Sequence, residues 1–312
     1  MSAAGRFSGK AGLLLAAACL ALAGSVHGAV NSVASLADPL DNNGGGARAE
    51  GMGSAFVGVA DDAETLLWNP AGLGLLPTAE LELDHNSWIA GILQETGIIT
   101  FPAGELGGFG LDADYVNYGT LNSYDENGNQ TGVYSPYRFG LGAGWGKELL
   151  PGFSAGLSLN GSTQDIDGSS YSDLSGNLGA LWCPMPNLRI GLAYNNLGTQ
   201  VAGYALDSSL NGGASYRFDL TQNNRLLLTG AASWEPQGVN RLQVGAEDTI
   251  QSTLALRIGY QDNLATTDIS GLAGLSAGLG LILGGLTVDY AFVPYGDLGD
   301  SNRISLGYKF GP

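Results

Sequence analysis

The stretch of chain that ends at Phe310 alternates strictly between two kinds of side chain. Its apolar set is Ile304, Leu306, Tyr308 and Phe310, and its polar or small set is Arg303, Ser305, Gly307 and Lys309. A period of two places each set on its own face of a β-strand. A strand with one apolar face suits a membrane β-barrel, with lipid outside and a wet or plugged lumen inside. Because no strand edge stays unpaired in hydrocarbon, one such strand implies a closed wall.

The composition agrees with an all-β wall. The chain has 312 residues, of which 51 are glycine, 13% are charged and 44% are hydrophobic, yet the mean hydropathy is only +0.09. This combination fits neither a helical membrane protein nor a disordered chain, and no break in composition marks two separate globular domains. It indicates dispersed apolar residues alternating with many small ones.

Residues 1–28 have the pattern of a secretory signal peptide. Arg6 and Lys10 precede an apolar run from Ala11 to Ala23, which is too short to span a bilayer, and small residues follow near Gly28. Removing this stretch leaves ten basic residues against 29 acidic ones. Such a balance argues against a nucleic-acid partner, because phosphate binding needs a basic surface.

Residues 78–312 are expected to form a transmembrane antiparallel β-barrel of about fourteen strands in the bacterial outer membrane. Segments of about ten alternating residues are separated by clusters of Gly, Pro, Asn or Asp. Short connections such as Leu149–Gly152 and Leu283–Gly285 alternate with longer ones such as Asn122–Val133 and Tyr295–Asn302. Short turns belong at the periplasmic rim and long loops outside, where outer-membrane lipid and lipopolysaccharide are the expected surroundings.

The charged residues give an internal check on the barrel, because they share the polar parity of their strands. An arginine that faced lipid at mid-membrane would cost about 2–4 kcal/mol, so this parity is expected to face the lumen. The predicted lumen-facing charges are Asp112, Asp114, Arg138, Arg189, Arg217, Arg241, Glu247, Arg257, Asp289 and Arg303.

Residues 29–77 are predicted to form a hatch, or plug, inside the barrel, because the stretch Asp41–Leu76 has no clean period of two. Asp61 or Asp62 is expected to cap a short helix through Trp68, which must end before Pro70. The apolar side chains of this stretch need cover, and the lumen is the nearest place to find it. The predicted hatch and ligand-path residues are Phe56, Val57, Val59, Asp61, Asp62, Leu67, Trp68, Asn69, Pro70 and Ala71.

The sequence predicts no enzyme activity, cofactor or metal site. No Gly-x-Ser-x-Gly elbow occurs between a strand and a helix, and no base is evident beside Cys183. His85 is the only histidine after residue 28, and no set of ligands with metal-site spacing surrounds it.

The run GMGSAFVGVADDAETLLWNPAGL resembles the N-terminal signature of PorV/PorQ-type outer-membrane proteins, which in turn resemble FadL-type long-chain fatty acid transporters. The likeness rests on the Gly-x-Gly start, Ala60-Asp61-Asp62-Ala63 and Asn69-Pro70-Ala71. The stretches AEDTIQSTLALRIGYQ and VDYAFVPYGDLGDSNRISLGYKF resemble the last strands of the PorV/PorQ type. The resemblance to the FadL type implies a hatch inside a fourteen-stranded barrel, with Asn-Pro-Ala as its hallmark.

Three functions follow from the resemblance and the pattern together. The first is passive transport of hydrophobic small molecules through a hatch-gated lumen. The second, implied by the likeness to PorV, is an accessory of type IX secretion that binds cargo or the translocon. The third is a plain structural barrel or porin. The external loops are short, polar and acidic, unlike the large hydrophobic capture loops of fatty acid transporters.

Overall fold

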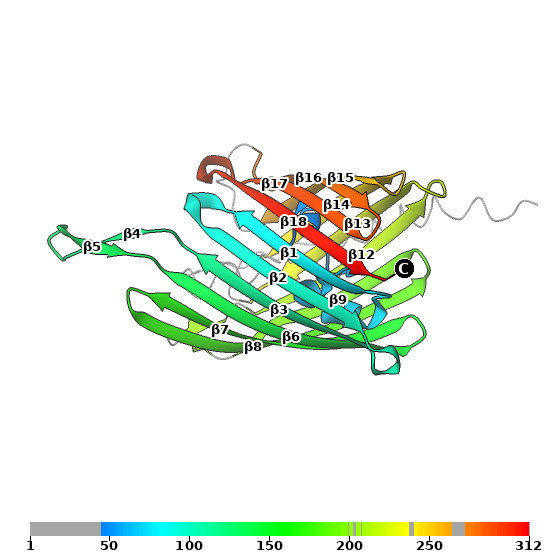
Figure 1. Ribbon diagram of the computed structural model, residues 1–312, viewed down its shortest axis with the longest axis horizontal. Coiled ribbons are helices and arrows are strands. Elements are labelled where there is room, and N and C mark those ends of the chain that lie inside the picture. Colours follow the sequence, from blue (N-terminus) through cyan, green and yellow to red (C-terminus); the bar gives the residue numbers. More distant parts are fainter. Residues whose placement is uncertain are drawn as a thin grey trace, which may run out of the picture.

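The computed structural model describes residues 45–198, 200–201, 204–206, 208–236, 240–263 and 272–311. Within these ranges fourteen antiparallel strands form one closed barrel, as expected from the sequence (Figure 1). The barrel strands are β1 (Ala79–Ser87), β2 (Leu93–Pro102), β3 (Gly108–Asn117), β6 (Tyr137–Leu150), β7 (Phe153–Ile166), β8 (Ser169–Met185), β9 (Leu188–Gly198), β12 (Ser209–Asp219), β13 (Arg225–Trp234), β14 (Arg241–Ile250), β15 (Leu254–Asn263), β16 (Leu275–Leu283), β17 (Leu286–Pro294) and β18 (Asp300–Phe310). The predicted signal peptide, residues 1–28, and residues 29–44 lie outside the described ranges.

Strands β1 and β18 close the barrel, with Ala79 opposite Phe310 and Ser87 opposite Asn302. The alternation that predicted the wall is visible in the exposure of β18: Ile304 is 50% exposed on the outside, whereas Arg303 is 1% exposed on the inside. The same alternation of exposed apolar and buried small or polar residues runs along β6. An apolar outer face over a closed wall is what a bilayer requires.

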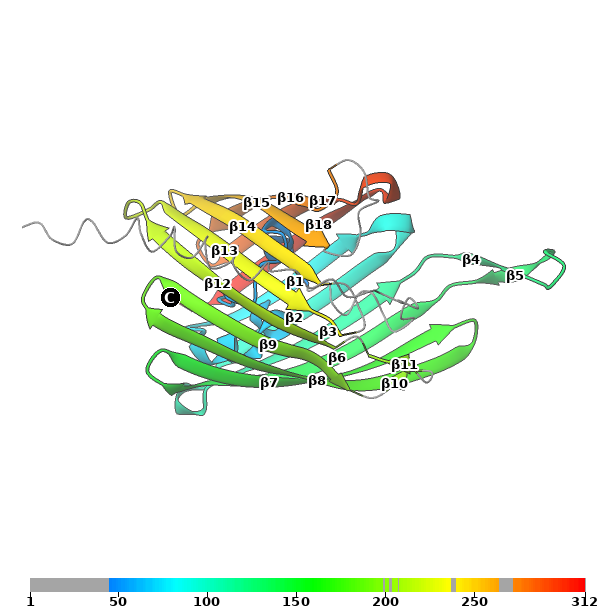
Figure 2. The same cartoon turned by 180° about the vertical axis from the view of Figure 1, so that it is seen from behind.

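The longest connections lie at one end of the barrel, as the sequence indicates, but the turn between β7 and β8 at that end has only two residues, Asp167 and Gly168. The predicted loop Asn122–Val133 contains a hairpin of β4 (Leu121–Tyr124) and β5 (Gln130–Tyr134), which projects from one end of the barrel (Figure 1). The small pair β10 (Gln200–Val201) and β11 (Tyr204–Ala205) lies at the same end (Figure 2). The loop expected at Tyr295–Asn302 is shorter than predicted, because β18 already begins at Asp300 and only the 3-10 turn η4 (Gly296–Leu298) intervenes.

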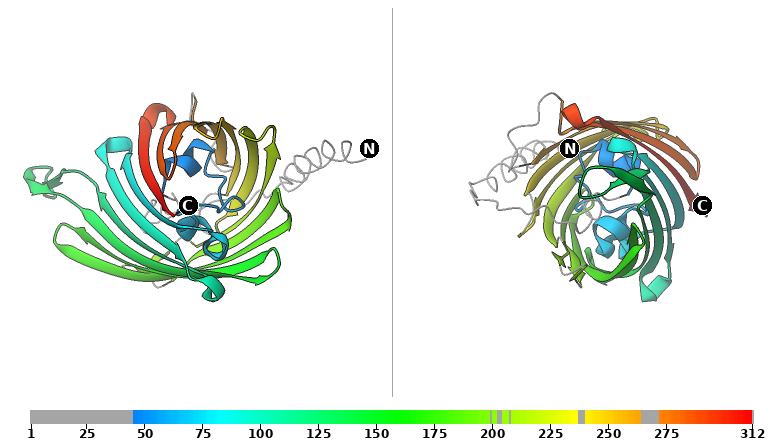
Figure 3. Two further views of the ribbon diagram at one scale, coloured as in Figure 1. Left: turned by 45° about the vertical axis from the view of Figure 1, so that its right-hand side comes forward. Right: turned by 90° about the vertical axis from the view of Figure 1, so that its left-hand side faces the viewer.

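Residues Gly45–Leu76, here called the luminal segment, lie inside the barrel (Figure 3). The segment contains α2 (Ala47–Gly51), α3 (Thr65–Trp68) and the 3-10 helix η1 (Pro70–Leu75). Helix α3 ends before Pro70, as predicted, but its N-cap is Glu64 rather than Asp61 or Asp62. Among the described residues, no helix is both long enough and apolar enough to cross a membrane.

The protein core lies between the luminal segment and the inner wall. One apolar cluster joins Met52, Phe56, Val59 and Trp68, and a second joins Leu66, Leu73, Leu76 and Ile98 of β2. Leu67 packs against both clusters. The lumen at this level is therefore filled by side chains of the segment itself.

Candidate functional site

Serine and threonine hydroxyls on several strands around the barrel form hydrogen bonds with backbone groups of the luminal segment. Ser305 Oγ accepts from the amide of Ala47 at 2.7 Å, and Ser276 Oγ accepts from the amide of Gly53 at 3.0 Å. Donor hydroxyls of the wall reach three further segment carbonyls: Thr229 Oγ1 to Ala55 (2.6 Å), Ser215 Oγ to Gly58 (2.8 Å) and Ser154 Oγ to Ala71 (2.6 Å). Strands from many positions around the barrel thus fix the segment in one orientation.

Inward-facing glycines let the segment approach the wall at backbone distance. A Cβ at Gly191 would overlap the carbonyl oxygen of Val57, and a Cβ at Gly156 would overlap that of Pro70. A Cβ would likewise overlap backbone atoms of the segment at the wall glycines Gly108, Gly146, Gly245 and Gly259, and at Gly179 it would overlap the side-chain oxygen of Asn69. Part of the high glycine content therefore serves to seat the segment closely.

Asn69 fixes the turn that leads from α3 into η1. Its Nδ2 donates to the carbonyls of Val57 (3.0 Å) and Ala180 (3.1 Å), and its Oδ1 accepts from the amide of Ala71 at 3.2 Å. Asn69 is fully buried. One side chain therefore connects two parts of the luminal segment with strand β8 of the wall.

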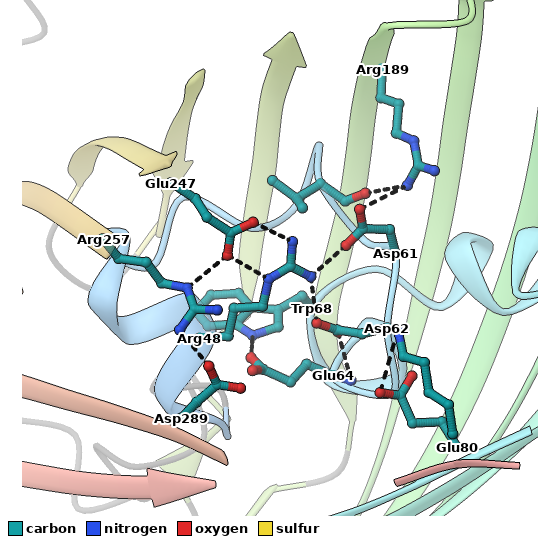
Figure 4. Close-up of polar contacts among 12 residues, drawn as sticks. Arg48, Asp61, Asp62, Glu64, Trp68, Glu80, Arg189, Glu247, Arg257 and Asp289 are labelled. Carbon is teal, nitrogen blue, oxygen red and sulfur yellow. Dashed lines mark hydrogen bonds and ion pairs between the residues drawn. The ribbon is translucent and has the colours of Figure 1, made fainter. Parts of the chain in front are cut away.

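Arg48 is the centre of a charge network between the segment and the wall (Figure 4). Its Nη1 lies 2.6 Å from both Asp61 Oδ1 and Asp62 Oδ2, and its Nε lies 2.9 Å from Glu247 Oε2. Glu247 also pairs with Arg257 at 2.7 Å, and Arg257 pairs with Asp289. Arg189 donates to the carbonyl of Val59 at 2.7 Å. The network spans strands β9, β14, β15 and β17.

Burial and neighbouring charges have opposite effects on the pKa of Arg48 but act in the same direction on the pKa of Glu64. Burial by itself would lower the pKa of Arg48, but Asp61, Glu247 and Asp62 raise this pKa well above its ordinary value. Burial raises the pKa of Glu64 well above its ordinary value, and the charges of Asp62 and Asp84 raise it further. Arg48 is thus well compensated, whereas Glu64 is surrounded by like charge.

A cavity of about 110 Å³ lies in the lumen on the loop side of the luminal segment. Leu67 and Trp68 of the segment contribute apolar side chains to it, while most of its wall is polar. The polar lining includes Gln94, Thr96, Asp112, Asp114, Arg138, Asn160, Ser175, Asn177, Asn195, Asn196, Ser209, Asn211, Ser233, Arg241 and Gln243. Among the described residues, Asp112 Oδ1 and Asn195 Oδ1 are buried without a hydrogen-bond partner.

The structure places the predicted hatch residues in three different settings. Leu67 and Trp68 line the cavity, whereas Phe56, Val57 and Val59 are packed in apolar clusters. Asp61 and Asp62 bind Arg48, and Asn69, Pro70 and Ala71 form the turn against the wall. The ligand path through these residues stays a prediction.

The predicted lumen-facing charges also divide into groups. Arg138 pairs with Asp114 at 2.8 Å beside the cavity, and Arg241 pairs with Glu235. A second group lies at the level of the luminal segment and consists of Arg189, Glu247, Arg257, Asp289 and Arg303. Arg303 donates to the carbonyl of Gly45. Arg217 lies near the other rim, where it pairs with Asp219 and its side chain is 42% exposed.

Sequence reasoning missed several residues of the site. Arg48 and Glu64 were not singled out, nor were Glu80, Glu82 and Asp84, which are buried along the inner face of β1. The alternation of Ala79–Ser87 (AELELDHNS) carried the signal for the β1 acids, because they share one parity opposite Leu81 and Leu83.

Comparisons with known proteins place this geometry in a fold. No protein-family model matches the chain. The toluene transporter TodX of Pseudomonas putida superposes with a TM-score of 0.59 at 14% identity, covering 85% of this chain and 98% of TodX. The toluene transporter TbuX of Ralstonia pickettii superposes with a TM-score of 0.58 at 16% identity, covering 86% of this chain and 100% of TbuX. A FadL homologue of Pseudomonas aeruginosa superposes with a TM-score of 0.54 at 12% identity, covering 86% of this chain and 98% of the homologue.

The chain has the fold of the FadL-type outer-membrane barrels. Together with the apolar outer face, this fold places it in the bacterial outer membrane. A curated relative, a UPF0164 protein of Treponema pallidum (strain Nichols), is 26% identical over 171 residues, which are 50% of this chain and only 42% of that protein. The PorV/PorQ assignment, the secretion partners and the absence of enzyme activity stay predictions.

Proposed function

We propose that the protein is a passive conduit for small hydrophobic molecules, with the luminal segment as its gate. Two of the structures that share its fold are described as toluene transporters. The barrel supplies a route across the membrane, and the segment occupies that route between the cavity and the short-turn end. Transport then requires the segment to shift against the wall.

The position of Leu67 and Trp68 is the observation that carries the proposal. Both side chains line the cavity, and both belong to or pack against the apolar clusters beneath it. An apolar molecule that reaches the cavity therefore meets two large apolar side chains of the segment, and behind them the apolar packing continues through Phe56 and Leu66. Burial of apolar area against these residues favours that route over the polar wall.

The test measures hydrocarbon entry into intact cells, because lipopolysaccharide slows passage of apolar molecules whereas phospholipid vesicles leak them. A host without its own hydrocarbon channel should take up labelled toluene faster when it expresses this protein. Trp68→Ala should change that rate, whereas Trp234→Ala, which removes a tryptophan exposed on the outer face, should not. Equal uptake with and without the protein, at normal barrel assembly, would contradict the proposal.

Deletion of Gly51–Leu73 provides a second readout. Removing these residues takes away most of the segment that fills the lumen, so ion conductance in a planar bilayer should rise sharply above that of the intact protein. If the intact and deleted forms conduct equally, the segment does not close the lumen and cannot be its gate.

A further inference from the structure

Three carboxylates meet where the luminal segment touches strand β1. Asp62 and Glu64 come from the segment and Glu82 from β1, and one oxygen of each lies within 4.8 Å of the other two. All three residues are buried. We propose that Asp62, Glu64 and Glu82 bind a divalent cation, best matched by Ca²⁺, which fastens the segment to the wall.

The charges around the cluster do not balance. Arg48 is shared between Asp61, Asp62 and Glu247, and Lys309 lies 3.7 Å from Glu80. Within the described ranges, no ion pair includes Glu64 or Glu82. Every Lys, Arg and His after residue 28 lies in those ranges, and the nearest further guanidinium, that of Arg303, donates to the carbonyl of Gly45 rather than to a carboxylate of the cluster. Buried unpaired carboxylates are costly, and a bound cation would remove that cost.

A single oxygen of Glu64 points to a ligand independently of the charge count. Glu64 Oε2 accepts from Trp68 Nε1 at 3.3 Å, but Oε1 is buried without any hydrogen-bond partner among the described residues. Glu64 is 0% exposed. Buried polar atoms almost always have a partner, so an orphaned carboxylate oxygen inside a cluster of acids calls for an ion or a proton.

Gly46 shows that two of these oxygens converge on one point. A Cβ at Gly46 would overlap Glu64 Oε1 and would lie 2.6 Å from Glu82 Oε1. Gly46 has φ −79°, a conformation open to any residue, so its backbone does not require glycine here. The absent side chain leaves both oxygens free to approach a common position.

The oxygen set and its spacing fit Ca²⁺. This ion takes six to eight oxygen ligands at 2.3–2.6 Å, so two ligands on one ion can stand almost 5 Å apart. Mg²⁺ demands near-ideal octahedral geometry and usually keeps several water ligands, so a buried cluster of three carboxylates suits it less well than Ca²⁺. Asp62 keeps lone pairs for the ion even though its oxygens already accept from Arg48 and from the amide of Glu64.

The site is independent of the transported ligand, and its test uses binding and stability rather than uptake. Full-length protein in detergent is stripped with EDTA and titrated with Ca²⁺, with bound metal measured by equilibrium dialysis. Wild type should bind one tight Ca²⁺, and Glu64→Gln and Glu82→Gln should each weaken it by at least about tenfold. Glu105→Gln, which changes an exposed turn residue, is the matched control. Equal affinity in wild type and both variants would overturn the site.

Tb³⁺, a luminescent substitute for Ca²⁺, gives a local readout because Trp68 contacts Glu64. Tryptophan excitation should produce Tb³⁺ emission that Ca²⁺ displaces. Gly46→Ala should reduce this emission by intruding on the oxygens, whereas Gly45→Ala, whose nearest neighbour is a Leu67 methyl group, should not. Emission that survives Glu64→Gln unchanged would place the ion elsewhere.

Urea unfolding separates a cation from shared protons. Ca²⁺ should raise the unfolding midpoint of wild type over that in EDTA, because an ion that binds only the folded state stabilises it. Glu64→Gln removes a like charge, so it should be at least as stable as wild type in EDTA and insensitive to Ca²⁺. A wild-type midpoint that is the same in Ca²⁺ and EDTA would show that the carboxyls share protons instead.

Discussion

Asn69 donates a hydrogen bond from its side-chain amide to the backbone carbonyl of Ala180, 111 residues further along the chain, at 3.1 Å. The same amide also reaches Val57, so the turn before η1, its own segment and the barrel wall meet at one side chain. The Asn-Pro-Ala sequence therefore has a physical role in this protein: Pro70 starts the 3-10 helix and Asn69 caps it while bonding to the wall.

Replacing Asn69 with alanine should loosen the luminal segment without opening the barrel wall. The change leaves the buried carbonyls of Val57 and Ala180 without this donor, at a cost of about 1–3 kcal/mol. Hydrogen exchange should rise in η1 while the strands stay protected. Asn127→Ala, at the exposed tip of the β4–β5 hairpin, should change stability by less than about 0.5 kcal/mol. Unchanged exchange in Asn69→Ala would mean that the turn is held by other contacts.

A methyl group at Gly191 should displace the segment from strand β9. Its Cβ would overlap the carbonyl oxygen of Val57, so Gly191→Ala should destabilise the fold by about 1–3 kcal/mol through overpacking. Gly212→Ala, on the neighbouring strand, meets only a Leu192 methyl group at 3.8 Å and should be nearly neutral. The comparison uses urea titrations of both variants in the same detergent. Equal unfolding midpoints would show that the luminal segment does not pack closely against strand β9 at Gly191.

Removal of Arg48 should be far more damaging than removal of a rim arginine. Arg48→Met leaves the buried carboxylates of Asp62 and Glu247 short of a partner, which should cost about 3–5 kcal/mol. Arg225→Met loses only an exposed pair with Asp219 and should cost about 0–1 kcal/mol. The measurement is the urea midpoint, and similar losses in the two variants would show that Arg48 is not a structural centre.

An arginine on the outer face tests the position of the bilayer. Ile258 is 61% exposed near the middle of β15, so Ile258→Arg should cost about 2–4 kcal/mol in lipid vesicles. Leu106→Arg, in the turn between β2 and β3, should cost only about 0–1 kcal/mol. If both substitutions cost the same, the apolar belt does not coincide with the membrane.

Local periodicity predicted the barrel wall well, because the alternation of polar and apolar residues within each strand shows which face points to the lumen and which to lipid. Arg303 beside Ile304 already specifies the orientation of β18, and the strand count follows from repeating that pattern. The bounds of loops were less predictable. The β18 ladder extends back to Asp300 because Asp300 and Ser301 pair with Pro294 and Val293 of β17, a contact that no local pattern reveals.

The candidate site could be predicted only in part, because its contacts join residues that are far apart in the sequence. The apolar and Asn-Pro-Ala content of the luminal segment marked it as distinct, but its partners lie far away in sequence. Arg48 meets Glu247 across 199 residues, and Glu64 meets Glu82 of the wall. The sequence predicted no metal cluster, because carboxylates on a folded segment and on a strand have no fixed spacing along the chain.

A reversible lock between the segment and the wall tests the gate most directly. An ideal Cβ at Gly213 would lie 2.7 Å from Val57 Cγ1, so cysteines at positions 57 and 213 should join, in a background with Cys19 and Cys183 replaced by serine. The same Cβ would lie 2.8 Å from the carbonyl oxygen of Gly230, so the reduced double variant must first show wild-type barrel assembly and uptake. The control lock joins Thr163 and Ser172, whose hydroxyls lie 3.0 Å apart within the wall. Oxidation of the Val57→Cys/Gly213→Cys pair should reduce toluene uptake by intact cells to the level without protein, and dithiothreitol should restore it. Uptake that is as fast with the segment locked as with the control lock would contradict a moving gate.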